Sequence, residues 1–296
     1  MNDDIGKINL LTSMGFKKSQ AQQALALCNG DVDLAVDRIL SGHISNAASQ
    51  NDESATRSLH STSTAADIIQ TTVSQYSIPN GRSACTCIAL QTASTILQGL
   101  NNCVETQSPK EVITPEHLRS LLISGVGMYN ELAKHDTRTT SVEHLSPEEV
   151  MNALVTHPNL NLGIKLLGSV RQGVLTSSGN SPLGLKQTIN ECKTAESSKE
   201  NEWMALVITK TPETICIFLP PKNCENDSSR HQYVVIDSHP RPGLSTEGCY
   251  AAFHASMDDF VSTLEKIFPA TDLGDDVGEI MAAMYNSFDV YPLQTL

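Results

Sequence analysis

The sequence lacks several features that mark common classes of protein. Its eight cysteines form no CxxC pair and no zinc-knuckle spacing, so neither a structural zinc site nor a disulfide framework is expected. Basic residues number 20 against 33 acidic ones, and a formal net charge of -13 would repel a phosphate backbone. We therefore expect no metal, no other cofactor and no nucleic-acid partner.

Long apolar runs are also missing. No stretch approaches the roughly 18 apolar residues that a membrane-spanning helix needs. The first residues include two acids and no basic segment ahead of an apolar run, which is unlike a secretory signal. We expect no membrane partner, a cytoplasmic location with the nucleus as an alternative, and a monomer.

Composition divides the chain into three parts. Residues 4–42 have apolar residues at helical spacing, which predicts three short helices around a small core. Residues 43–66 are rich in Ser, Thr, Asn and Ala with little apolar content, and we expect a flexible linker there. Residues 67–296 mix helical and strand patterns, which predicts an α+β domain with an antiparallel sheet.

Periodicity gives the expected elements of this third part. Helices are expected over 85–100, 115–135 and 146–154, then over 256–268 and near 278–288. Strands are expected within 162–168, 203–210, 213–220, 232–239 and 248–256, each bounded by Gly, Pro, Asn or charged clusters.

The first part has a set of motifs that resembles a known domain. Met14-Gly15-Phe16 forms the first expected loop, Asn29-Gly30-Asp31 the second turn, and Ile39-Leu40 ends the third helix. Over LTSMGFKKSQAQQALALCNGDVDLAVDRILSG the chain resembles a ubiquitin-associated (UBA) domain. The resemblance implies that ubiquitin, polyubiquitin chains and ubiquitinated proteins dock on a patch made by Met14, Gly15, Phe16 and Leu40. The alternative is that these residues only close a three-helix core.

Two cysteines, Cys85 and Cys87, stand at the start of the helix expected over 85–100. The positive end of a helix beside a histidine stabilises a thiolate. The face that begins at Cys85 continues with almost wholly apolar residues, whereas the face of Cys87 continues with Gln91, Ser94 and Gln98. The pattern favours Cys85 as the cysteine that faces the sheet, with a plain core role as the alternative.

The strand expected over 232–239 ends in Asp237-Ser238-His239. Alternation places Asp237 and His239 on one face, about 7 Å apart at their Cα atoms. A carboxylate at that separation accepts one imidazole N–H and leaves the other ring nitrogen for a thiol at the strand rim. The alternatives are an edge-strand ion pair and a metal site, although no third ligand accompanies the pair.

The third part also resembles a family of enzymes. The segments SQYSIPNGRSACTCIAL, EHLRSLLISGVGMYNE, VVIDSHPR and GCYAAFHASMDDFVSTLEKIF, within residues 70–268, are similar to the viral-tegument-like deubiquitinases. That family implies a papain-like fold and hydrolysis of the (iso)peptide bond at the ubiquitin C-terminus. It also implies Cys85 as nucleophile, His239 as base, Asp237 as its orienter and Gln75 as oxyanion donor, with Asn80 as the substitute for Gln75.

Two other functions remain open at this stage, a non-catalytic ubiquitin-binding adaptor and a cysteine protease for another ubiquitin-like modifier. The remaining histidines lack a paired acid at strand spacing, and we expect them to be solvated or to pack in the core. They are His43, His60, His117, His135, His144, His157, His231 and His254.

Overall fold

The computed structural model describes residues 2–13, 16–28, 30–40, 67–102, 108–135, 144–157, 160–176, 181–194, 201–222, 232–241, 243–245, 248–274 and 278–296. The chain divides into two compact units, Met1–Thr64 with Phe268–Tyr285 and Ala65–Ile267 with Asn286–Leu296. Several predicted features lie outside the described residues: the linker over 43–66, Met14, Gly15 and the side chain of Leu40.

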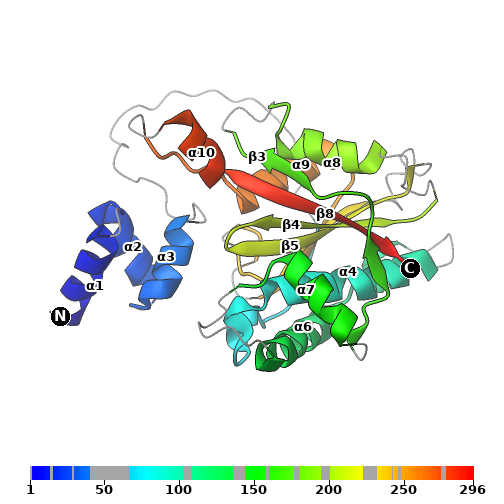
Figure 1. Ribbon diagram of the computed structural model, residues 1–296, viewed down its shortest axis with the longest axis horizontal. Helices are drawn as coiled ribbons and strands as arrows, with labels where there is room; N and C mark the ends of the chain where they lie inside the picture. The colour runs from blue at the N-terminus through cyan, green and yellow to red at the C-terminus, as the bar shows by residue number, and fades with distance from the viewer. Residues whose placement is uncertain are drawn as a thin grey trace. The chain divides into compact units, whose positions relative to one another are not determined.

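Within residues 2–40, the first unit forms three short helices, α1 (Asn2–Ser13), α2 (Lys18–Leu27) and α3 (Val32–Leu40), as the periodicity predicts (Figure 1). Gly30 follows the end of α2; its φ of 79° is the left-handed conformation, and its N–H donates to the Leu25 carbonyl at 2.8 Å. The buried core consists of Leu11, Ala21, Ala24, Leu25, Cys28, Ala35 and Ile39, and Phe16 packs against it while staying partly exposed.

The second unit is built on one antiparallel sheet. Its strand order is β1-β7-β6-β5-β4-β8-β2, and β3 pairs with β8 beside that path. The strands are β1 (Asp67–Gln70), β2 (Ile164–Leu166), β3 (Arg171–Val174), β4 (Met204–Lys210), β5 (Glu213–Leu219), β6 (Tyr233–Asp237), β7 (Tyr250–His254) and β8 (Ser287–Thr295). Strands β4 and β5 form a tight hairpin that pairs Lys210 with Glu213.

Helices cover both faces of this sheet, so its central strands are buried on both sides (Figure 1). On β5, Cys216 and Phe218 join the core that α4 packs against, while Ile215 and Ile217 are buried on the opposite face. The first layer contains α4 (Cys85–Asn102), α5 (Pro109–Val112), α6 (Pro115–His135) and α7 (Pro147–Thr156). The second contains α8 (Leu185–Thr194) and α9 (Met257–Ile267).

The expected α+β class with an antiparallel sheet is confirmed, and the end of the chain differs in one respect. A helix was expected near 278–288, but α10 covers only Glu279–Tyr285 and the chain then enters β8. Strand β8 pairs with β2, β3 and β4, so a segment with no strand prediction lies inside the sheet. Among the described helices, none has the length and apolar character needed to cross a bilayer.

Helices α4 and α6 approach each other closely at Gly125. A Cβ atom at that position would lie 2.5 Å from the Ile88 Cα and 2.9 Å from the Ile88 N, closer than atoms can pack. Two residues along the same helix, a Cβ at Gly127 would meet no atom within 4 Å. The absence of a side chain at Gly125 therefore sets how closely α4 packs against α6.

We expect Gly125→Ala to lower the free energy of unfolding by about 1–3 kcal/mol, because the added methyl forces two helix backbones apart. Gly127→Ala is the matched control and should raise it by up to about 1 kcal/mol, because alanine favours the helix and the site is open. Urea unfolding of the two variants measures both changes. Equal effects of the same sign would contradict this packing.

Candidate active site

Cys85 is the first residue of α4, directly after two short 3₁₀ turns, η1 (Gln75–Ser77) and η2 (Gly81–Ser83). Its side chain is buried, and its Sγ contacts the Pro212 carbonyl oxygen at 3.6 Å. The next residue fastens the start of the helix to β5, because the hydroxyls of Thr86 and Thr214 are 3.2 Å apart. The thiol therefore lies at the N-terminal end of a helix that is fixed to the sheet.

Asp237 and His239 approach Cys85 from the end of β6. The Nδ1–H of His239 donates to the Asp237 Oδ1 at 2.5 Å, and the backbone N–H of His239 donates to the same oxygen at 2.9 Å. The imidazole also acts on the thiol of Cys85, because His239 is one of the groups that lower the pKa of that thiol. The structure thus brings together the three side chains that the sequence pattern singled out.

The geometry of this pair differs from the sequence expectation in two ways. Strand β6 ends at Asp237, so His239 lies in the turn beyond the strand. The two side chains are brought together by this turn and not by the alternation of residues along a strand. His239 was expected at a solvent-facing rim, but it is buried, and the half-exposed Tyr76 ring lies 5.8 Å from it, centroid to centroid.

A buried arginine completes the surroundings of Asp237. The Nε of Arg241 donates to the Asp237 Oδ2 at 2.6 Å, and one terminal nitrogen donates to the Glu213 Oε2 at 2.9 Å. Burial alone would raise the pKa of the Asp237 carboxyl, but Arg241 and His239 outweigh it and hold that pKa below its usual value of 3.8. The carboxylate therefore stays ionised at neutral pH.

The protonation of Cys85 follows from the groups around it. Burial raises the pKa of its thiol, but hydrogen bonds from His144 and His239 outweigh burial and lower it to about 6 from the ordinary 9.0. For His239, burial favours the neutral ring, yet Tyr76 and Asp237 raise its pKa well above the usual 6.5. The stable pair near neutral pH is a thiolate beside an imidazolium.

Cys87 differs sharply from Cys85, although the two are only two residues apart. It is buried in the core between the first layer of helices and the sheet, where a polar helix face was expected. Burial raises the pKa of the Cys87 thiol, and a negative charge on Cys85 raises it further. Burial also raises the pKa of Cys216 and Cys249. Among these four cysteines, Cys85 is the one whose thiol has a lowered pKa.

Gln75 lies beside this centre, but its amide already has partners. Its Nε2 donates to the Arg82 carbonyl at 3.1 Å, and its Oε1 accepts from the Ser238 hydroxyl at 2.7 Å. These bonds tie η1 both to the turn before Cys85 and to the residue before His239. The predicted substitute, Asn80, is exposed and has a φ of 62° in the turn between η1 and η2.

His144 is the residue at this centre that the sequence analysis missed. It was expected to be solvated or to pack in the core, and its side chain is half-buried and lowers the pKa of the Cys85 thiol. It precedes α7 by three positions and has no acid at strand spacing, so no local pattern distinguishes it. Of the other histidines, His43, His60, His231 and the side chain of His135 lie outside the described residues.

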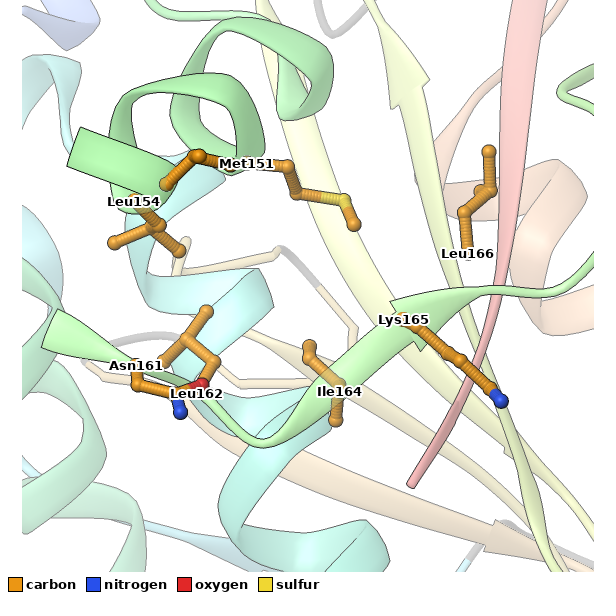
Figure 2. A pocket seen from close by; sticks show the side chains of 8 residues that line it. Met151, Leu154, Asn161, Leu162, Ile164, Lys165 and Leu166 are labelled. Atoms are coloured by element: carbon orange, nitrogen blue, oxygen red, sulfur yellow. The ribbon is translucent and has the colours of Figure 1, made fainter. Parts of the chain in front are cut away.

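A groove of about 410 Å³ lies elsewhere on the second unit, between α7 and β2. Figure 2 shows Met151 and Leu154 of α7 opposite Ile164 and Lys165 of β2. None of the residues predicted to act in catalysis lines it. The groove is therefore separate from the centre around Cys85.

The first unit is identified by comparison with known domain families. The family described as UBA/TS-N domain matches residues 7–39, which include α2 and most of α1 and α3. Residues 7–39 are a UBA domain. UBA domains bind ubiquitin, so ubiquitin is the partner that this part of the chain supports. No curated protein sequence matches the chain significantly.

The lowered pKa of Cys85 gives a test that needs no substrate. The thiolate contribution to the ultraviolet absorbance, taken as the difference between the unmodified chain and Cys85→Ala, should appear as the pH rises through about 6. The same difference measured in a Cys87→Ala background should keep this midpoint, since the pKa of Cys87 is raised. A midpoint near the ordinary value of 9.0 would contradict the described contacts.

Proposed function

We propose that the second unit is a papain-like cysteine deubiquitinase with a Cys85-His239-Asp237 triad. The observation that carries the proposal is the His239 imidazole, which is hydrogen-bonded to Asp237 and lowers the pKa of the Cys85 thiol, on a polypeptide that also has a UBA domain. A thiolate beside an imidazolium is the resting state of a thiol nucleophile. The UBA domain supplies the reason to choose ubiquitin as the substrate, because a catalytic centre alone does not reveal it.

The first half of the proposed reaction is acyl transfer to sulfur. The Cys85 thiolate attacks the carbonyl carbon at the ubiquitin C-terminus, a C–S bond forms, and the carbonyl electron pair moves onto oxygen. Gln75 uses one amide hydrogen on the Arg82 carbonyl, and its second is the one we assign to this oxyanion. When the intermediate collapses, the C–N bond breaks and the leaving amine takes a proton from His239.

The second half releases ubiquitin by hydrolysis of the thioester. His239, now neutral, accepts a proton from water, whose oxygen attacks the same carbonyl carbon. The C–S bond then breaks, and the sulfur leaves as the stabilised thiolate. Asp237 fixes the His239 tautomer in both halves, because its Oδ1 accepts the Nδ1 proton and leaves the other ring nitrogen for transfer.

Two alternative functions, an adaptor and a protease for another modifier, predict different covalent adducts with ubiquitin and modifier probes. A non-catalytic ubiquitin adaptor binds ubiquitin through residues 7–39 but forms no covalent adduct. A protease for another ubiquitin-like modifier reacts with a probe made from that modifier in preference to ubiquitin. The lowered pKa of the Cys85 thiol favours catalysis over an adaptor role.

Ubiquitin with an electrophile at its C-terminus should form a covalent adduct with the full chain, and mass spectrometry should locate the bond at Cys85. Cys85→Ala should abolish both this adduct and the cleavage of ubiquitin chains. Cys87→Ala is the matched control and should leave both intact. An unreactive full chain, or chain cleavage by Cys85→Ala, would rule out the proposed nucleophile.

Binding by the UBA domain can be measured separately from catalysis in a Cys85→Ala background. We expect Phe16→Ala to raise the Kd for ubiquitin by about tenfold or more, because truncation removes a partly exposed aromatic contact. Leu27→Ala, which truncates an exposed leucine at the end of α2, should leave the Kd within about twofold. Equal affinities of the two variants would argue against the Phe16 patch.

A further inference from the structure

An exposed aromatic ring lies against the buried imidazole of His239. The ring centroids of Tyr76 and His239 are 5.8 Å apart, and the two ring planes are tilted by 58°. His239 and Cys85 are only 3% and 2% exposed, whereas Tyr76 is 40% exposed. Asp237, which accepts the Nδ1 proton of His239, is also buried. Tyr76 therefore stands on the side of the imidazole that faces solvent.

Hydrogen bonds within η1 hold this ring in place. Tyr76 is the central residue of the turn. The Ser77 N–H donates to the Ser74 carbonyl at 3.0 Å, and the Ser74 N–H donates to the Ser77 hydroxyl at 3.3 Å. The Ile78 N–H donates to the Gln75 carbonyl at 3.2 Å. Both ends of the turn are closed by these bonds, which fixes the backbone that carries the Tyr76 ring.

The same turn joins the two segments that carry the proposed nucleophile and base. The Gln75 N–H donates to the Ser238 carbonyl at 3.2 Å, and the Ser238 hydroxyl donates to the Gln75 Oε1 at 2.7 Å. The Gln75 Nε2 donates to the Arg82 carbonyl at 3.1 Å. A Cβ at Gly81 would lie 2.2 Å from the Gln75 carbonyl oxygen, so η1 and η2 touch through their backbones. The ring therefore sits on a bridge between the start of α4 and the turn after β6.

A ring fixed in this place limits the shape of the substrate. A substrate that reaches the buried sulfur and imidazole passes the exposed ring of Tyr76. The ring leaves room beside it for an extended backbone, but a side chain next to the scissile bond would collide with it. Glycine has no side chain, and ubiquitin ends in two glycines.

We propose that Tyr76 is a specificity-determining residue, whose ring over His239 admits glycine and excludes larger residues directly before the scissile bond. This inference rests on the proposed function, and it narrows the substrate to acyl groups that end in glycine. Tyr76 controls access to the centre and takes no part in proton transfer.

Alkylation of Cys85 tests this role without ubiquitin. Iodoacetamide and 2-iodopropanamide differ by one methyl group on the reacting carbon, and mass spectrometry follows each adduct at Cys85. The ratio of their rates with glutathione gives the intrinsic difference between them. We expect the unmodified chain to exceed this ratio about tenfold or more, and Tyr76→Ala to fall within about threefold of it. Tyr76→Phe keeps the ring and should keep the full discrimination.

Two ubiquitin C-terminal reporters extend the test to the proposed substrate. One ends in the native two glycines, and the other has alanine in place of the penultimate glycine. We expect Tyr76→Ala to narrow the preference of the unmodified chain for the first reporter about tenfold or more, by raising kcat/KM on the second. Tyr285→Ala is the matched control, because it truncates a comparably exposed tyrosine of α10, and it should keep the preference.

Three results would overturn the role of Tyr76. One is that Tyr76→Ala discriminates against both methylated reagents as strongly as the unmodified chain does. Another is that Tyr76→Phe loses as much discrimination as Tyr76→Ala. The third is that Tyr76→Ala no longer reacts with iodoacetamide at Cys85, because the ring would then support the centre instead of controlling access to it.

The alkylation uses no ubiquitin, so the two proposals fail in distinguishable ways. If the unmodified chain cleaves no ubiquitin reporter while Tyr76→Ala still gains reaction with 2-iodopropanamide, deubiquitination is wrong and the access role of Tyr76 stands. If the chain cleaves the native reporter and Tyr76→Ala changes neither discrimination, deubiquitination stands and the role of Tyr76 is wrong.

Discussion

The arrangement around Cys85 depends on the buried charge of Asp237. A carboxylate removed from water is costly unless it is paired and hydrogen-bonded, and Asp237 meets this condition through Arg241 and two donors of His239. Arg241 is itself buried and is balanced by Glu213, the first residue of β5. Glu213 follows Pro212, whose carbonyl contacts the Cys85 sulfur, so one network joins β6, β5 and the start of α4. Removing any charge in this network leaves another buried charge uncompensated.

The contrast between Cys85 and Cys87 shows what controls thiol reactivity in this fold. Both lie in the first turn of α4, so both experience the positive end of the helix. Both are buried, and yet the pKa of one thiol is lowered while that of the other is raised. The helix dipole is therefore not the deciding effect. The imidazoles of His144 and His239 decide the difference, because they lower the pKa of Cys85 and do not act on that of Cys87.

Sequence patterns predicted the long periodic elements and the core of the site. Helices α4 and α6 and strands β4 to β7 have enough apolar repeats to define their type. Strand β8 lacked such a signal, because Pro292 lies within it and proline normally argues against an inner strand. Here its carbonyl accepts from the Leu167 N–H, and Pro292 lies opposite Leu206 of β4. The proline is tolerated because β8 is held by its pairing with β2, β3 and β4, which outweighs the one N–H donor that proline lacks.

The predicted site residues and the missed one differ in what fixes their positions. Asp237 and His239 are two residues apart, so they meet whether the chain continues as a strand or turns after Asp237. The position of His144 depends instead on the Ser146 cap of α7, on the buried Leu145 beside it and on the packing of α7 against α4. The cap is a local sequence pattern, but the packing of α7 against α4 is not encoded near His144. A residue placed by tertiary packing becomes visible only when the fold is known.

Burial of the proposed nucleophile also bears on how the two units divide their work. Only 2% of Cys85 is exposed, so under the proposed function its substrate is a narrow, extended chain end instead of a folded surface. Such a contact is small, and small contacts bind weakly unless other surfaces add affinity. If Cys85 is the nucleophile, a UBA domain on the same polypeptide raises the local concentration of ubiquitin without any new contact at the catalytic centre. Under the proposed function, this gain applies to substrates with more than one ubiquitin, because one molecule can occupy residues 7–39 while another reaches Cys85.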